Sequence, residues 1–111
     1  MEGICLKFYT YENHQHKGIL TYDWILKCAK EHKIPGGSVF RAIAGYGRHG
    51  TIHEEHFFEL GANLPIEVVF ILSQEQTKSF LALITKELPS LFYTKSDIEF
   101  PDSVDKLVTA N

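Results

Sequence analysis

The sequence predicts an α+β domain with the element order strand, helix, strand, strand, helix, strand. Two segments, 22–32 and 73–88, repeat apolar residues at helical spacing. Four shorter segments are rich in apolar and β-branched residues, as strands are, and they span residues 4–11, 38–45, 66–72 and 91–98. Glycine and proline residues separate several of these segments, where the chain must turn. This order is that of the ferredoxin-like βαββαβ sandwich, in which two helices pack on one face of a four-stranded antiparallel sheet.

The first strand and the first helix each have one apolar face. In the strand, alternate residues from Ile4 to Phe8 are aliphatic or aromatic and point to one side. A polar loop with two histidines follows at 12–18, and we expect Thr21 to cap the helix. The turn Ile-Pro-Gly-Gly at 34–37 ends this helical part of the chain.

The second helix has clear start and stop signals. Ser73, with Gln76 three residues later, has the pattern of a capping box, and Pro89 ends the helix. The residues expected to be buried on this helix are Thr77, Phe80, Leu81, Ile84 and Leu88. We expect residues 1–100 to form a single domain and residues 101–111 to form a weakly patterned tail.

Two of the predicted strands are apolar on both faces. Strand 66–72 places Val69 and Ile71 opposite its other apolar residues, and strand 38–45 has nearly the same pattern. An antiparallel sheet with one covered face normally keeps its other face polar. We therefore expect other copies of the chain to cover the second face.

The composition excludes several classes of protein. The formal net charge is −3 and the lysines and arginines do not cluster, which argues against nucleic-acid binding. No apolar run reaches the ~20 residues that cross a bilayer, so we expect no membrane insertion. The N-terminal residues lack the basic and apolar regions of a signal peptide, which predicts a cytoplasmic protein with Cys5 and Cys28 reduced and buried.

The most informative loop follows the second strand. Gly45, Gly47 and Gly50 form the pattern GxGxxG, and backbone amides in such a loop can build a concave anion site. Three nearby side chains would add positive charge and hydrogen-bond donors, namely Arg48, His49 and His53. The alternative is a glycine-rich hairpin loop, since a dinucleotide-binding fingerprint requires a helix directly after the glycines.

Several motifs, taken in order, resemble those of the PII-like signalling proteins, in the branch known as domain of unknown function 190. They are Gly-Gly-Ser-Val-Phe-Arg-Ala-Ile-Ala-Gly-Tyr-Gly at 36–47, Ile-His at 52–53 and Leu-Pro-Ile-Glu-Val at 64–68, with Tyr22 at the start of the first helix. The resemblance implies a ferredoxin-like trimer that binds small anionic effectors, chiefly adenine nucleotides, in the clefts between subunits. It also implies that the loop Gly45–His53 moves on binding and docks to a partner protein.

We therefore expect a regulatory homotrimer that is not an enzyme and that holds no cofactor apart from an adenine nucleotide effector. The residues expected to bind the effector are Arg41, Gly45, Tyr46, Gly47, Arg48, His49, Gly50, His53 and Glu67. Arg41 lies on an otherwise apolar strand face, where an arginine needs a partner. It either forms an ion pair, with Glu67 as the expected partner, or recognises a phosphate or carboxylate through its planar guanidinium.

The alternative function is a trimeric divalent-metal-binding or metal-tolerance protein of similar fold. Six histidines are many for this length, and His14 with His16, or His49 with His53 and His56, are candidate ligands of a transition metal. The metal function requires histidines that converge on one point. The effector function requires a basic cleft between subunits.

Overall fold

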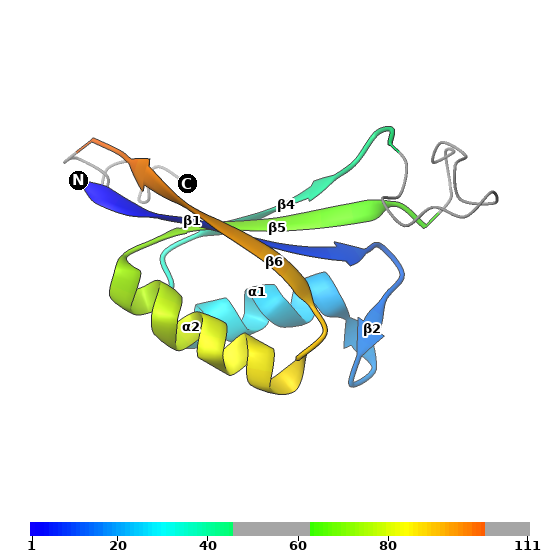
Figure 1. The fold of residues 1–111 in the computed structure, drawn as a ribbon. Helices are drawn as coiled ribbons and strands as arrows, with labels where there is room; N and C mark the ends of the chain where they lie inside the picture. Colours follow the sequence, from blue (N-terminus) through cyan, green and yellow to red (C-terminus); the bar gives the residue numbers. More distant parts are fainter. Residues whose placement is uncertain (46–62, 102–111) are drawn as a thin grey trace.

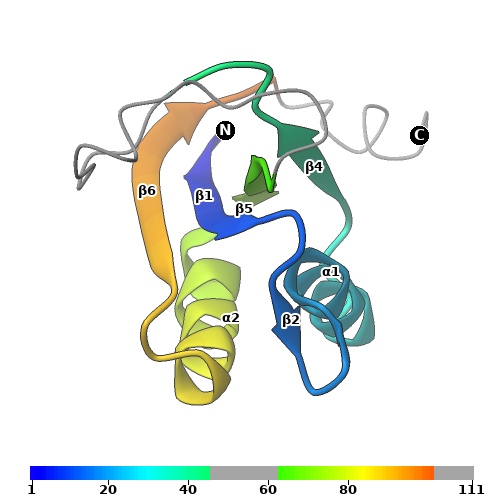
Figure 2. The same ribbon diagram turned by 90° about the vertical axis from the view of Figure 1, so that its right-hand side faces the viewer.

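The computed structural model describes residues 1–45 and 63–101 and confirms the predicted sandwich (Figure 1). Four strands form an antiparallel sheet in the order β4-β5-β1-β6, and both helices cover the same face of it. The strands are β1 (Glu2–Tyr11), β4 (Gly37–Arg41), β5 (Pro65–Leu72) and β6 (Phe92–Glu99), and the helices are α1 (Thr21–Glu31) and α2 (Gln74–Glu87). Figure 2 shows α1 beneath the β4 side of the sheet and α2 beneath the β6 side. None of the helices in the described part of the chain is long and apolar enough to cross a membrane.

The core lies between the sheet and the helices and is built on the two central strands. Leu6 pairs with Phe70 and Phe8 with Val68, and all four side chains are at most 1% exposed. The rings of Phe8, Phe70 and Phe80 meet edge to face, with centroids between 5.1 and 6.3 Å apart. This geometry is the one that aromatic quadrupoles favour, so the rings fix how α2 sits on the sheet.

The two helices begin in different ways. Ser73 caps α2 as predicted, because its hydroxyl accepts from the Gln76 amide at 3.0 Å and its amide donates to the Gln76 side chain at 2.9 Å. The prediction that Thr21 caps α1 is wrong, since Leu20 is the N-cap residue and Thr21 is the first residue of the helix. Thr21 is fully buried, and its hydroxyl lies 2.5 Å from the His14 ring nitrogen Nδ1.

The polar segment predicted as a loop contains a small hairpin. Its strands are β2 (Gln15–His16) and β3 (Ile19–Leu20), which pair with each other beside the main sheet. Lys17 and Gly18 form the turn with φ values of +53° and +82°. Two central residues with positive φ are typical of the type I′ turn that joins twisted antiparallel strands.

β4 ends at Arg41, earlier than the predicted strand end at residue 45. The last hydrogen bond between β4 and β5 runs from the Ala42 amide to the Pro65 carbonyl, at 3.0 Å. Pro65 is the first residue of β5 and has no N–H, so it cannot return a hydrogen bond and the ladder stops there. Beyond this point the chain leaves the sheet, and Ile43 is 95% exposed.

The face of the sheet away from the helices is uncovered in the single chain. It is named the open face below, and its described residues on the four strands include Cys5, Lys7, Tyr9, Phe40, Glu67, Val69, Ile71, Phe92 and Thr94. Phe40, Ile71 and Phe92 are 56%, 46% and 61% exposed. The sequence prediction of a second apolar face is therefore confirmed for these strands. Both cysteines are free, but each is only partly buried, and Cys5 lies on the open face rather than in the core.

Candidate functional site

Three of the nine predicted site residues lie in the described part of the chain, namely Arg41, Gly45 and Glu67. The others lie outside the described residues: Tyr46, Gly47, Arg48, His49, Gly50 and His53. The register of β4 on β5 pairs Arg41 with Ile66 and Phe40 with Glu67. Paired residues point to the same face of a sheet. Arg41 therefore lies on the helix side with Ile66, whereas Glu67 lies on the open face.

This register makes the predicted ion pair between Arg41 and Glu67 wrong. A carboxylate does hold Arg41, as predicted, but it belongs to Glu12, whose Oε2 contacts the guanidinium Nη2. Glu67 instead forms an ion pair with Lys7 on the neighbouring strand, with 3.3 Å between Oε1 and Nζ.

Backbone hydrogen bonds fix Glu12 in position. The Glu12 amide donates to the Leu64 carbonyl at 2.8 Å, and the Asn13 amide donates to the Asn63 side chain at 2.8 Å. Both acceptors directly precede β5. The end of β1, the end of β4 and the residues before β5 therefore meet at one place, named the loop root below and defined by Glu12, Asn13, Arg41, Asn63 and Leu64.

The loop root presents a cation to solvent. The Arg41 side chain is 58% exposed, whereas that of Glu12 is 24% exposed. An arginine keeps its charge at any physiological pH, and its planar fork of donors matches a carboxylate or a phosphate. A dissolved anion can therefore approach the guanidinium and compete with Glu12 for it.

Reasoning from the sequence missed Glu12 and the two asparagines. In the sequence, Glu12 is one polar residue in a polar stretch, and Asn13 and Asn63 are 50 positions apart. The strand register brings them together, because Tyr11 at the end of β1 pairs with Pro65 at the start of β5. The three residues could have been identified from the sequence only by extending the pairing of β1 with β5 to its last pair of residues.

Glu67 has a clear local role on the open face. Its carboxylate accepts a hydrogen bond from the Lys7 ammonium and attracts its charge, and both effects raise the pKa of Lys7 above its ordinary value. The Tyr9 hydroxyl lies 3.3 Å from the Thr94 hydroxyl on the same face. The open face therefore carries a few satisfied polar groups among its apolar side chains.

The histidines of the described residues do not converge on a metal site. Within residues 1–45 and 63–101, no three His, Cys, Asp or Glu side chains are placed to hold a metal ion. His14 contacts Thr21, and His16 contacts Glu87 at 3.3 Å. The other proposed ligands, His49, His53 and His56, lie outside the described residues.

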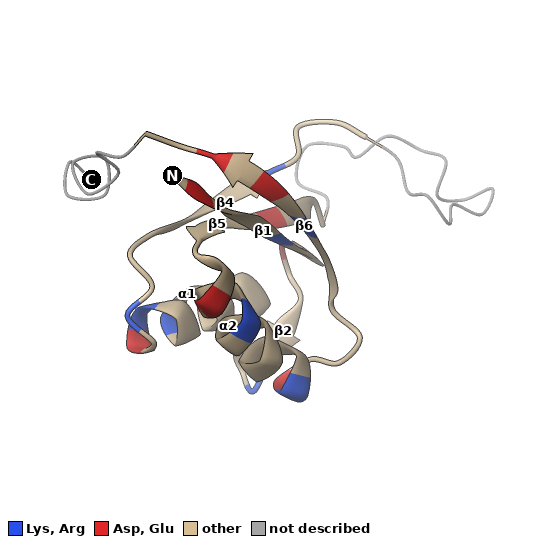
Figure 3. Ribbon diagram, turned by 60° about the vertical axis from the view of Figure 1, so that its left-hand side comes forward, with Lys and Arg blue, Asp and Glu red and all other residues tan. Residues whose placement is uncertain are grey.

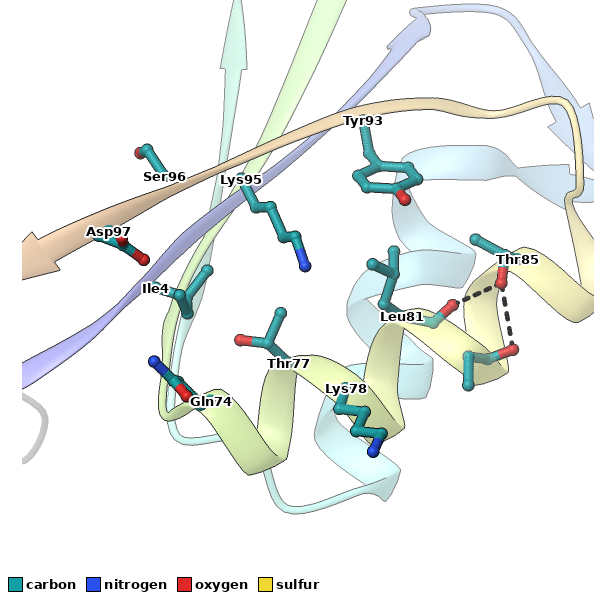
Figure 4. A pocket seen from close by; sticks show the side chains of 11 residues that line it. Ile4, Gln74, Thr77, Lys78, Leu81, Thr85, Tyr93, Lys95, Ser96 and Asp97 are labelled. Carbon is teal, nitrogen blue, oxygen red and sulfur yellow. Dashed lines mark hydrogen bonds between the residues drawn. The ribbon is translucent and has the colours of Figure 1, made fainter.

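A groove of about 910 Å³ separates α2 from β6 (Figure 4). Ile4 and Leu81 form an apolar part of its lining, and Lys95 and Asp97 face it from β6. The charged residues that line the groove are Lys78 of α2 and Lys95 and Asp97 of β6, so charges of both signs are mixed there.

The charges of the described chain are dispersed. Figure 3 shows acidic and basic positions mixed over the helices and the sheet. The described part of the chain therefore presents individual cations such as Arg41 and no extended basic surface.

The fold is similar to that of CPII, a nitrogen regulatory PII-like protein from Thiomonas intermedia K12. The structure of CPII bound to ADP and bicarbonate matches with a TM-score of 0.67 and 12% sequence identity, covering 94% of this chain and 93% of CPII. A second structure, of CPII bound to ADP, AMP and bicarbonate, matches with a TM-score of 0.63 and 13% identity, covering 91% of this chain and 97% of CPII.

Two relatives are more similar in sequence. A UPF0166 protein of Aquifex aeolicus is 37% identical over 94 residues, which are 85% of this chain and 89% of the relative. A UPF0166 protein of Methanocaldococcus jannaschii is 33% identical over 92 residues, which are 83% of this chain and 78% of the relative. The model of the family DUF190, described as uncharacterized ACR, matches residues 3–100, and the chain therefore belongs to this family.

Proposed function

We propose that the chain is a PII-like regulatory protein, without catalytic activity, that binds a small anionic effector of the adenine nucleotide class. The observation that carries the proposal is the exposed Arg41 guanidinium at the loop root, held by the Glu12 carboxylate. The fold supports it, because CPII has been solved with ADP, AMP and bicarbonate bound. Phosphate and carboxylate groups match the planar fork of an arginine guanidinium.

In the proposed mechanism, the effector exchanges with Glu12 on Arg41. Arg41 is the last residue of β4, and the chain continues from it through Gly45 towards the predicted loop Gly45–His53. A change of partner at Arg41 therefore acts directly on the residues that lead into this loop. We propose that the loop, with the predicted residues that lie on it, completes the effector site and signals to a partner protein. Glu67, which lies on the open face and pairs with Lys7, is not part of the proposed site.

We also propose that the chain is a homotrimer in which the open faces pack inward. The exposed Phe40, Ile71 and Phe92 support this proposal, since exposed apolar patches usually mark interaction surfaces. β4 is an edge strand of the sheet, so Arg41 lies at the boundary where a neighbouring subunit would stand. An effector site between subunits is consistent with this position.

Calorimetric titration with ADP and AMP tests the effector proposal on three variants. Arg41→Gln should weaken ADP binding by roughly 10- to 150-fold, the equivalent of about 1.5–3 kcal/mol for a charge-assisted hydrogen bond. Glu12→Gln should strengthen binding severalfold, because it removes the charge that competes for Arg41. Lys27→Gln, which removes one exposed positive charge from α1, is the matched control and should bind like the wild type.

Opposite effects of the two loop-root variants are the result that supports the mechanism. If Arg41→Gln binds ADP as tightly as the wild type, Arg41 is not a ligand contact. If the wild-type protein binds neither ADP nor AMP at millimolar concentration, the adenine nucleotide proposal is wrong.

A further inference from the structure

We infer that the β2–β3 hairpin is an ionic latch that couples the C-terminal end of α2 to the loop root, so that the state of each end changes the stability of the other. The inference deepens the proposed function, because the loop root contains the proposed effector contact Arg41. The latch itself is a physical connection that exists without an effector, and it can be tested without one.

One carboxylate oxygen holds the hairpin to α2. Glu87 is the last residue of α2, and its Oε2 lies 3.1 Å from the Lys17 Nζ and 3.3 Å from the His16 Nε2. The His16 ring also packs edge-on against Trp24 of α1, with centroids 4.7 Å apart, and its side chain is only 16% exposed. Two consecutive residues of the hairpin thus contact both helices.

The hairpin depends on these contacts for its shape. Its two strands have two residues each, and an isolated hairpin of this size is not stable in water. Lys17 has a φ of +53°, a conformation that residues other than glycine rarely adopt. Loss of the Glu87 contacts would therefore leave the packing of His16 on Trp24 to hold the turn without its ionic partner.

The same chain segment is fixed to the loop root only a few residues earlier. Glu12 and Asn13 hydrogen-bond to the residues before β5, as described above. His14 accepts a hydrogen bond from the Thr21 amide at 2.8 Å, and its ring contacts the buried Thr21 hydroxyl. Residues 12–17 therefore contact the loop root, the start of α1 and the end of α2 in direct succession.

The charged groups around the latch keep the Glu87 carboxyl group ionised. Lys17 and His16, which donate hydrogen bonds to Glu87, lower the pKa of its carboxyl group. Burial and the nearby carboxylates of Glu31 and Glu87 raise the pKa of the Cys28 thiol on α1, so this thiol stays protonated at neutral pH. Lys27 of α1 also influences Cys28, in the opposite direction.

The consequence is reciprocal coupling. If the hairpin separates from Glu87, residues 12–14 lose one of the contacts that hold them, and Glu12 is held less firmly against Arg41. If an anion draws Arg41 away from Glu12, the same residues lose another of these contacts and keep their backbone hydrogen bonds to the loop root and to Thr21. A coupling between two sites acts equally in both directions, so changes at Glu87 should alter the loop root and changes at Arg41 should alter the hairpin.

Amide hydrogen exchange, measured residue by residue by NMR on the full chain, tests the latch. In Glu87→Gln, the amides of Glu12, Asn13 and Thr21 should exchange at least tenfold faster than in the wild type, while core amides of β5 stay unchanged. Glu31→Gln is the matched control, because Glu31 is likewise the last residue of its helix. Lys17→Gln should reproduce the effect of Glu87→Gln from the other side of the contact.

Combining Glu87→Gln with Arg41→Gln tests the coupling. The double variant should raise the exchange rate of the Thr21 amide by less than the product of the two single effects, because either change alone already loosens the same residues 12–14. Single effects that multiply, or rates in Glu87→Gln and Lys17→Gln within twofold of the wild type, would overturn the inference. Titration with ADP bears on the proposed function alone, so the failure of one is distinguishable from the failure of the other.

Discussion

Adjacent residues on β5 offer a sharp test of which face builds the core and which face builds the proposed trimer. Val68 is 0% exposed and points to the helices, whereas Val69 points to the open face. A smaller side chain in place of Val68 should reduce the stability of each chain. A charge at the second should prevent assembly and leave the chain folded.

The magnitude for Val68→Ala follows from its burial. The change removes two buried methyl groups, which is worth about 1.6 kcal/mol of transfer free energy. The cavity left between Phe8 and Val39, its partners on the neighbouring strands, adds to this loss, so we expect about 2 kcal/mol in total. For a domain of this size, such a loss lowers Tm by roughly 8–16 °C.

Val69→Asp should leave the single chain folded and should prevent its assembly. In the single chain, the new carboxylate would lie on a solvent-facing surface opposite Lys7, so the fold should tolerate it. In a trimer with inward-facing sheets, the change would bring three carboxylates into the shared interior, where an unpaired charge is costly.

Light scattering during size-exclusion chromatography and thermal unfolding by circular dichroism measure both effects at one protein concentration. We expect the wild type and Val68→Ala to elute at three times the 12.7 kDa chain mass, and Val69→Asp at that mass itself with an unchanged spectrum. A trimeric Val69→Asp protein would show that the open face is not the interface. A Val68→Ala protein with unchanged Tm would contradict the core described above.

Three further predictions follow from the caps, the charges and the loop. Ser73→Ala should lower the free energy of unfolding by about 1 kcal/mol in urea titrations through loss of the capping box, while Ser79→Ala on the exposed side of the same helix should change little. The folded-state pKa of Glu87 lies below its unfolded value of 4.5, so its contribution to stability is present above pH 4.5 and is lost as pH falls through the folded value. Glu87→Gln should remove this part of the acid dependence of unfolding. A plot of stability against pH identical to that of the wild type would contradict the prediction. Exchange across 45–53 should slow when ADP binds, and equally strong protection with and without ADP would exclude the loop as the moving element.

The sequence was sufficient to predict the fold because each element carried its own local signal. The alternation of β1 placed Leu6 and Phe8 on the buried face, and the capping box placed the start of α2 at Ser73. These signals act within one element, over two to four residues, where period and hydrogen-bond chemistry are fixed. The start of α1 was missed because Thr21 uses its hydroxyl on His14, a contact made through tertiary packing.

The partner of Arg41 could not be predicted for a related reason. Choosing between Glu12 and Glu67 requires the register of two strand pairs, and a shift of one residue reverses the face of every side chain. A glutamate on the adjacent strand is the natural first choice, yet the observed register places it opposite Phe40. Polar residues outside the strands, such as Asn13 and Asn63, have no repeating pattern in the sequence, so only the folded chain reveals that they meet.

The ion pair in the middle of the open face bears on how that face can be covered. Lys7 and Glu67 are 38% and 34% exposed in the single chain, so covering the face would remove both from water. Burying two charges is tolerable only when they remain bonded to each other, and the 3.3 Å contact already provides that bond before assembly. An apolar partner surface can then bury Phe40, Ile71 and Phe92 without having to supply a counter-charge. The neutral pair also disfavours partners that would place a lone charge there, which limits the ways in which a second copy can pack on this face.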